Sequence, residues 1–151
     1  MDETTGREGV FHSSREIPHA PERVWAAFAR RELLERWWGP AGFTNTFEVC
    51  EFEPGGRWSL KMHGPNGHDY PNESVFERIE PPTRLVVRHV SVPQYRLTIS
   101  LEATPVGTRV SWSQAFDNQE TGRRLESIVV PGNEQNLDRL SAEVLHPPAD
   151  D

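Results

Sequence analysis

Cysteine is nearly absent from this chain of 151 residues, which contains only Cys50. No disulfide can form within the chain, and a lone, strand-flanked thiol favours a reducing compartment, so we expect a cytoplasmic location. No hydrophobic run approaches the roughly 20 residues that a membrane-spanning helix needs. The acidic, polar N-terminus is unlike a secretory signal. We therefore expect neither a disulfide-rich fold nor a membrane partner.

Positive charge is also scarce, because 16 Lys and Arg stand against 23 Asp and Glu for a formal net charge of −7. Nucleic-acid binding needs a basic surface, so no nucleic-acid partner is expected. The chain has no Gly-x-Ser-x-Gly elbow and no glycine-rich phosphate loop. His63, His68 and Asp69 flank a glycine-rich loop without a recognisable zinc spacing, which indicates an exposed hairpin. The sequence thus predicts no metal, no cofactor and no recognisable catalytic set.

Proline and glycine are frequent, with 13 and 11 copies, and they divide the chain into short elements. Residues 10–17 read as a strand, and Pro21 suits the first turn of a helix. A second short helix ends at the motif Trp37-Trp38-Gly39-Pro40. From Phe43 onward hydrophobic residues recur with a period of two, typical of half-buried strands. We expect strands at residues 43–50, 57–62, 74–80, 84–90, 95–101 and 109–116, with positive φ angles at Gly55 and Gly56.

The C-terminal part predicts an interrupted helix. Residues 121–130 favour a helix that Pro131-Gly132 should break or kink, and residues 133–145 carry Leu137, Leu140 and Val144 at helical spacing. Glu134, Asp138, Arg139 and Glu143 suggest a solvated face. An α+β helix-grip fold, in which a curved antiparallel sheet wraps the last helix, buries every apolar face. We expect one such domain over residues 10–145, with flexible ends at residues 1–9 and 146–151.

The concave side of this sheet and the last helix predict either a filled core or a ligand cavity. Gln114 falls on the apolar phase of its strand, and Tyr95 and His89 place polar groups on apolar faces. Glu51 shares a phase with Val49, so it either points inward as an acid or base or forms a salt bridge with Arg57. The candidate cavity residues are Phe47, Trp58, Leu60, Met62, His89, Tyr95, Leu97, Ile99, Trp112, Gln114, Asn133 and Leu137.

Several motifs together resemble one known family. They are residues 21–25, 37–40, 54–57, 77–82, the Gly107-Thr108 turn and residues 137–140. The chain resembles the Hsp90-ATPase-activator-homologue (AHSA1-like) family of the Bet v 1/START-like (SRPBCC) superfamily over roughly residues 10–144. Similar proteins are mostly bacterial, single-domain and uncharacterised. The resemblance implies a helix-grip fold and a cavity for hydrophobic or aromatic molecules, and some branches catalyse polyketide cyclisation.

The same resemblance also points to two departures. The eukaryotic namesake binds Hsp90 with an additional N-terminal domain for which 151 residues leave no room, so no Hsp90 interaction is expected. Many relatives carry Gly-Trp at the start of the last helix, where this chain has Gly132-Asn133. An amide in place of an indole predicts a larger and more polar cavity.

Three functions are compatible with these patterns. The first is binding of a small hydrophobic or aromatic ligand between the sheet and the C-terminal helix. The second is a cyclase- or hydratase-like enzyme in which His89 or Glu51 moves protons. The third is a chaperone-related interaction module with a filled core and an exposed apolar patch. A homodimer is compatible with the sequence, although no segment argues for one.

Overall fold

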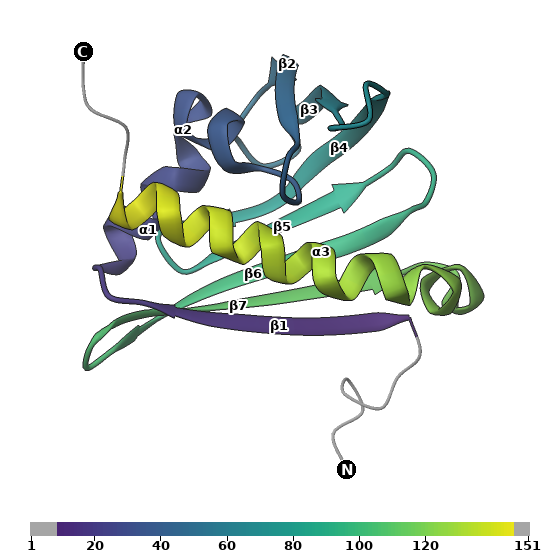
Figure 1. Cartoon of the computed structure of the whole chain (residues 1–151). Coiled ribbons are helices and arrows are strands. Elements are labelled where there is room, and N and C mark those ends of the chain that lie inside the picture. Colours follow the sequence, from purple (N-terminus) through teal and green to yellow (C-terminus); the bar gives the residue numbers. More distant parts are fainter. Residues whose placement is uncertain (1–8, 147–151) are drawn as a thin grey trace.

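The computed structural model describes residues 9–146, so the predicted flexible ends lie almost wholly outside it. In this range one seven-stranded antiparallel sheet, in the order β1-β7-β6-β5-β4-β3-β2, carries three helices on one face (Figure 1). The α+β helix-grip prediction is confirmed. The elements are β1 (Val10–Ile17), α1 (Pro21–Ala29), α2 (Arg31–Trp37), β2 (Thr44–Cys50), β3 (Arg57–His63), β4 (Asp69–Glu80), β5 (Arg84–His89), β6 (Tyr95–Thr104), β7 (Gly107–Phe116) and α3 (Gln119–Leu145).

The first strand completes the sheet beside the last one. β1 pairs with β7 along its whole length, from Val10 opposite Ala115 to Ile17 opposite Thr108. Helix α3 lies across the concave face, while α1 and α2 cover one end of that face (Figure 1). The space between α3 and the middle strands is therefore enclosed on three sides by elements distant in sequence.

A bulge in β2 shifts the strict alternation that the sequence predicts. Phe47 pairs with Leu60, and Val49 then pairs with Ser59, so Glu48 is the extra residue. A bulge places two residues of one strand opposite a single partner residue and changes the faces that follow. Phe47 still faces the core, but the phase expected for Glu51 is lost.

The predictions for Glu51 were wrong. Its side chain is exposed, and its carboxylate accepts a hydrogen bond from the backbone N–H of Arg57 at 3.0 Å. The Arg57 guanidinium instead lies 3.7 Å from Glu73. Of the two turn glycines only Gly55 has a positive φ, of 82°. A Cβ atom on Gly56 would lie 1.9 Å from the carbonyl oxygen of Glu51, so close backbone approach requires glycine there.

Helix α3 continues through Pro131, and the predicted break does not occur. Proline removes one backbone N–H, which leaves the carbonyl of Ser127 without its helical partner. Both Ser127 and Pro131 are exposed, so water can bind this carbonyl. The C-terminal half carries the predicted core residues Leu137, Leu140 and Val144, all of which are buried.

The predicted solvated face of α3 is wrong for two residues. Arg139 is half-buried, and its guanidinium holds the connection from α2 to β2, an arrangement called here the Arg139 clamp. Burial lowers the pKa of Arg139. Glu143 is also buried and pairs with Arg36 at 2.7 Å. The five carbonyl acceptors of Arg139, at 2.8–3.3 Å, belong to Arg36, Trp38, Gly39, Pro40 and Phe43.

Candidate functional site

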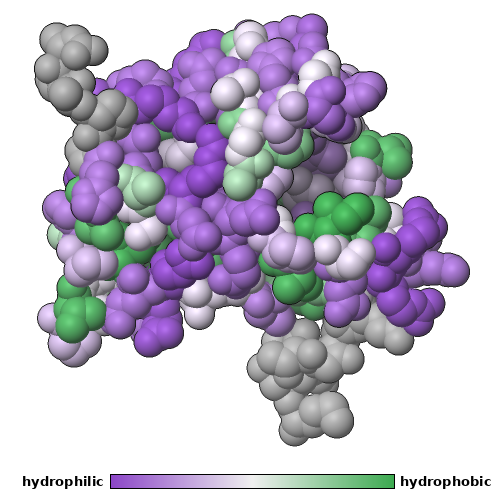
Figure 2. All heavy atoms as spheres, in the orientation of Figure 1, coloured by the Kyte–Doolittle hydropathy of each residue, from purple (hydrophilic) through white to green (hydrophobic). Residues whose placement is uncertain are grey.

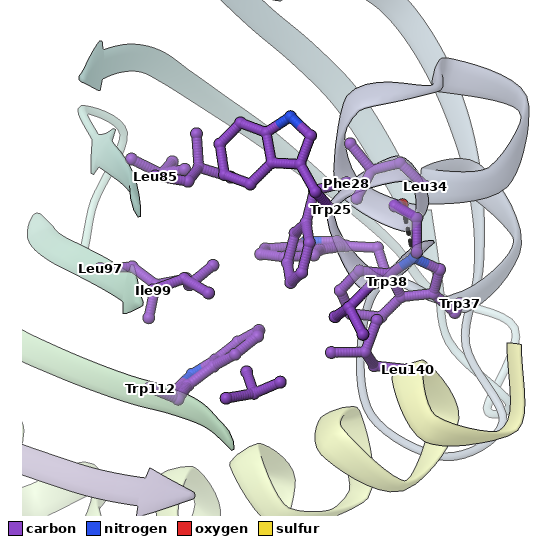
Figure 3. Close-up of a cluster of buried hydrophobic side chains, with 14 of the residues drawn as sticks. Trp25, Phe28, Leu34, Trp37, Trp38, Leu85, Leu97, Ile99, Trp112 and Leu140 are labelled. Carbon is purple, nitrogen blue, oxygen red and sulfur yellow. Dashed lines mark hydrogen bonds between the residues drawn. The ribbon is translucent and has the colours of Figure 1, made fainter. Parts of the chain in front are cut away.

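Aromatic side chains form the inner end of the concave face. The ring of Trp38, which follows α2, lies 4.8 Å from that of Trp58 on β3 and 5.6 Å from that of Trp112 on β7. Figure 3 shows Trp112, Leu97 and Ile99 extending from the sheet toward the tryptophans that end α2. The Trp37 indole N–H donates to the carbonyl of Ala27 at 2.9 Å, which fixes the angle between α1 and α2.

Beyond these rings the sheet and α3 do not close completely on each other, and a cavity of about 190 Å³ remains between them. It opens to the surface, and Figure 2 shows a hollow beside α3 with hydrophobic residues along one edge. Ile128, which is 69% exposed, lines this opening together with Val129. The other lining residues are Trp38, Gly39, Pro40, Trp58, Leu60, Met62, Asn72, Ser74, Val87, His89, Tyr95, Leu97, Trp112, Gln114, Gly132, Asn133 and Asn136.

His89 is buried in the wall, and both of its ring nitrogens are engaged by the protein. Its Nδ1 lies 2.8 Å from the carbonyl oxygen of Pro93, which can only accept, so this nitrogen carries a proton. Its Nε2 lies 2.6 Å from the Asn72 side-chain oxygen and 3.3 Å from the Ser91 hydroxyl. Burial lowers the pKa of His89 below its ordinary value of 6.5. The protein therefore holds the ring in place at both nitrogens.

Tyr95 stacks on His89, with ring centroids 4.4 Å apart and an angle of 5° between the planes. Burial raises the pKa of Tyr95 to about 12, because the low dielectric disfavours the phenolate. The stack places a phenol and an imidazole side by side on the cavity wall.

Gln114 and Asn133 form the polar centre of the cavity. The Asn133 side-chain amide nitrogen donates to the Gln114 side-chain oxygen at 3.1 Å, which joins β7 to α3. Both residues are more than nine-tenths buried, at 8% and 9% exposure. Within residues 9–146 the other polar atom of each amide has no hydrogen-bond partner.

Two indole N–H groups of the wall are also unpaired. Within the described residues Trp58 Nε1 and Trp112 Nε1 are buried without a hydrogen-bond partner. Such a group costs about 1–3 kcal/mol in folding free energy. Buried donors without a partner lower the stability of the fold, so their presence in the wall of one cavity indicates a functional site.

No Asp, Glu, Lys or Arg lines the cavity, and burial disfavours the charged form of His89. Within residues 9–146 no group of three or more His, Cys, Asp and Glu side chains could hold a metal ion. His63 and Asp69 lie 2.7 Å apart on the β3–β4 hairpin and form a hydrogen bond there. The helices in this range include none with the length and apolarity to cross a membrane.

A model of the family described as Activator of Hsp90 ATPase homolog 1-like protein matches residues 18–144. The chain belongs to this family. No curated protein matches it. The AHSA1-like fold is also seen in similar solved structures. A protein from Arthrobacter aurescens is 28% identical over 95% of this chain and 89% of its own, with a TM-score of 0.84.

Two further structures support the same fold at lower identity. A protein from Nitrosomonas europaea is 23% identical, covering 90% of this chain and 93% of that one, with a TM-score of 0.81. An AHSA1-like protein from Aeromonas hydrophila is 20% identical, covering 94% and 99%, with a TM-score of 0.71.

In this AHSA1-like chain most of the predicted cavity residues come together, although contact with a ligand stays a prediction for all of them. Three do not reach the cavity, because Phe47, Ile99 and Leu137 are buried in the adjoining core cluster. The nine that line the cavity are Trp58, Leu60, Met62, His89, Tyr95, Leu97, Trp112, Gln114 and Asn133.

Sequence reasoning missed the contribution of three other segments. Trp38, Gly39 and Pro40 line the cavity because the Arg139 clamp folds their turn against α3. From the sequence, the motif that they form predicts only the end of a helix. Asn72 also lines it, because β4 begins at Asp69 and thus before the predicted start at Ser74, which lines the cavity as well. The third segment is Ile128 and Val129, which lie in the part of α3 before the predicted break or kink at Pro131-Gly132.

Proposed function

We propose that this AHSA1-like protein binds a small hydrophobic or aromatic molecule in the cavity between the sheet and α3. The observation that carries this proposal is an apolar cavity of about 190 Å³ that reaches the surface and holds unpaired amide groups. Domains of this superfamily typically bind hydrophobic ligands. Burial of ligand surface would supply about 25 cal/mol per Å² before the cost of association.

The residues of the wall suggest how the ligand is oriented. Trp58 and Trp112 offer flat apolar surfaces, Leu97 offers an aliphatic one, and Gln114 and Asn133 offer hydrogen bonds at the centre. Ligand sites in proteins commonly combine a mostly apolar lining with a few placed polar groups. The free thiol of Cys50 fits a reducing compartment, so we place this binding activity in the cytoplasm.

The two other functions have weaker support. A cyclase- or hydratase-like reaction needs a titrating group free to reach the substrate. Glu51 is exposed away from the cavity, and the ring nitrogens of His89 are both engaged by the protein. An interaction module predicts a filled core, whereas here the core is open between β6, β7 and α3.

Titration followed by tryptophan fluorescence tests the proposal, because Trp58 and Trp112 line the cavity. A panel of aromatic, fatty-acid and polyketide-like compounds should contain members that change the emission saturably. Leu97→Trp would fill the cavity and should abolish the change. Val106→Trp is the matched control, since it adds the same side chain at a position 60% exposed. A flat response of the folded wild-type protein across the panel would contradict the proposal.

A further inference from the structure

The hydrogen bond between Gln114 and Asn133 engages one of the two polar atoms of each side-chain amide. Each amide carries a donor NH₂ and an acceptor oxygen, and a single bond of 3.1 Å joins one donor to one acceptor. The Gln114 nitrogen and the Asn133 oxygen are left over. If both amides are turned by 180°, the roles exchange, yet one donor and one acceptor still remain. The cavity therefore presents a donor and an acceptor side by side, whichever orientation is taken.

These two groups are placed where only an occupant of the cavity can satisfy them. Both side chains are more than nine-tenths buried and both line the cavity. Within residues 9–146 neither leftover atom has a protein partner. An apolar occupant would displace water from them and leave both unpaired, at a cost of about 1–3 kcal/mol each.

The surroundings exclude a charged occupant. No side chain with a full charge lines the cavity, so an anion or cation would lose its hydration without a counter-ion. Burial disfavours the charged forms of His89 and Tyr95, which stack on each other in the cavity wall. The binding site has a polar centre and no Asp, Glu, Lys or Arg in its wall.

The volume limits the size of the part that is enclosed. An apolar cavity of about 150 Å³ holds benzene, and this cavity measures about 190 Å³. A single aromatic ring with one small polar substituent fits, and any longer tail must leave past Ile128 and Val129.

We propose that the enclosed part of the ligand is an uncharged single ring bearing a donor and an acceptor on neighbouring atoms, as in a carboxamide or a lactam. Such an edge pairs with the leftover donor and acceptor of Gln114 and Asn133 in two hydrogen bonds. This inference rests on the proposed function, because it names the chemical class that the same cavity takes.

Four probes of nearly equal size separate the chemistries. Benzamide offers a donor and an acceptor, acetophenone only an acceptor, isopropylbenzene neither, and benzoate a negative charge. Their dissociation constants can be measured on the full chain by ¹H–¹⁵N NMR titration, which also shows whether the indole and side-chain amide signals of the wall move. Benzamide should bind at least about tenfold more tightly than isopropylbenzene and benzoate, with acetophenone between, because a site with polar groups rejects analogues that leave them unpaired.

Variants link the ranking to the two amides. Gln114→Met with Asn133→Leu keeps the shape of the wall and removes its polar centre, so the preference for benzamide should fall to less than about twofold. Thr98→Val, on the next strand but outside the cavity lining, is the control and should leave the ranking unchanged. The wild-type ranking tests the inference even if the double variant does not fold.

The outcomes distinguish this inference from the proposed function. Equal affinities for all four probes, or tightest binding of benzoate or isopropylbenzene, would overturn the inference and leave a ligand-binding cavity in place. Failure of every probe to bind a folded protein would overturn the inference, and a flat fluorescence panel in addition would overturn the proposed function.

Discussion

Replacement of Arg139 by methionine tests how the cavity is held together. Methionine keeps much of the apolar stem of arginine but none of its donors. The five carbonyls of residues 36–43 that now bind the guanidinium would lose this donor. Two of them keep another donor, because the Asn45 side chain donates to the Trp38 carbonyl at 2.8 Å and the Phe43 N–H donates to the Pro40 carbonyl at 3.2 Å.

The expected loss of unfolding free energy follows from the two terminal nitrogens of the Arg139 guanidinium. Each donates to carbonyls at 3.3 Å or less, and hydrogen bonds from a charged donor contribute about 1.5–3 kcal/mol. Some carbonyls would bind water after the replacement, so we count one net interaction for each nitrogen. The free energy of unfolding should fall by about 3–6 kcal/mol, which lowers the melting temperature by roughly 10–20 °C for a domain of this size. Arg139→Lys should lose about half of this, because a single ammonium cannot reach both groups of carbonyls.

Urea unfolding followed by tryptophan fluorescence measures the change. Arg124→Met, an identical replacement at an exposed position of the same helix, should alter the free energy of unfolding by less than about 0.5 kcal/mol. If Arg139→Met behaves like this control, water satisfies the turn equally well and the clamp does not stabilise the fold.

Three further outcomes are expected. Because burial lowers the pKa of His89, the unfolded chain takes up a proton at higher pH than the folded protein, and the free energy of unfolding should decrease as the pH falls below about 6.5. His89→Gln should weaken this pH dependence, and equal pH profiles of the two proteins would contradict the prediction. In Tyr70→Phe the remaining Tyr95 should ionise at about pH 12 by ultraviolet absorbance, not near its ordinary value of 10. Asn133→Trp should fill the cavity and abolish ligand-induced fluorescence changes, and unchanged binding would show that Asn133 does not shape the site.

Periodicity predicted the fold well because it reports burial directly. In β6 the alternation of Leu97, Ile99 and Leu101 with polar residues matches one buried and one solvated face. Leu137 and Leu140 recur at helical spacing because one stripe of α3 meets the core. In each case a single element contains the whole signal, so no knowledge of its neighbours is needed.

The parts that sequence could not predict depend on contacts between elements. Nothing local marks Glu48 as the extra residue of a bulge, since the register is set by the pairing of β2 with β3. Arg139 resembles any surface arginine until the turn before β2 is placed beside it. Pro131-Gly132 predicts a break or a kink, but α3 continues because its exposed side tolerates the missing N–H of Pro131.

The uneven burial of α3 has an evolutionary consequence. Residues 126–132 include no buried side chain, whereas residues 133–144 include six and the Arg139 clamp. Substitutions in the first stretch can therefore reshape the mouth of the cavity at little cost in stability, and those in the second are constrained by the fold. A lineage built on this scaffold can acquire new ligands through one part of a single helix while selection preserves the other.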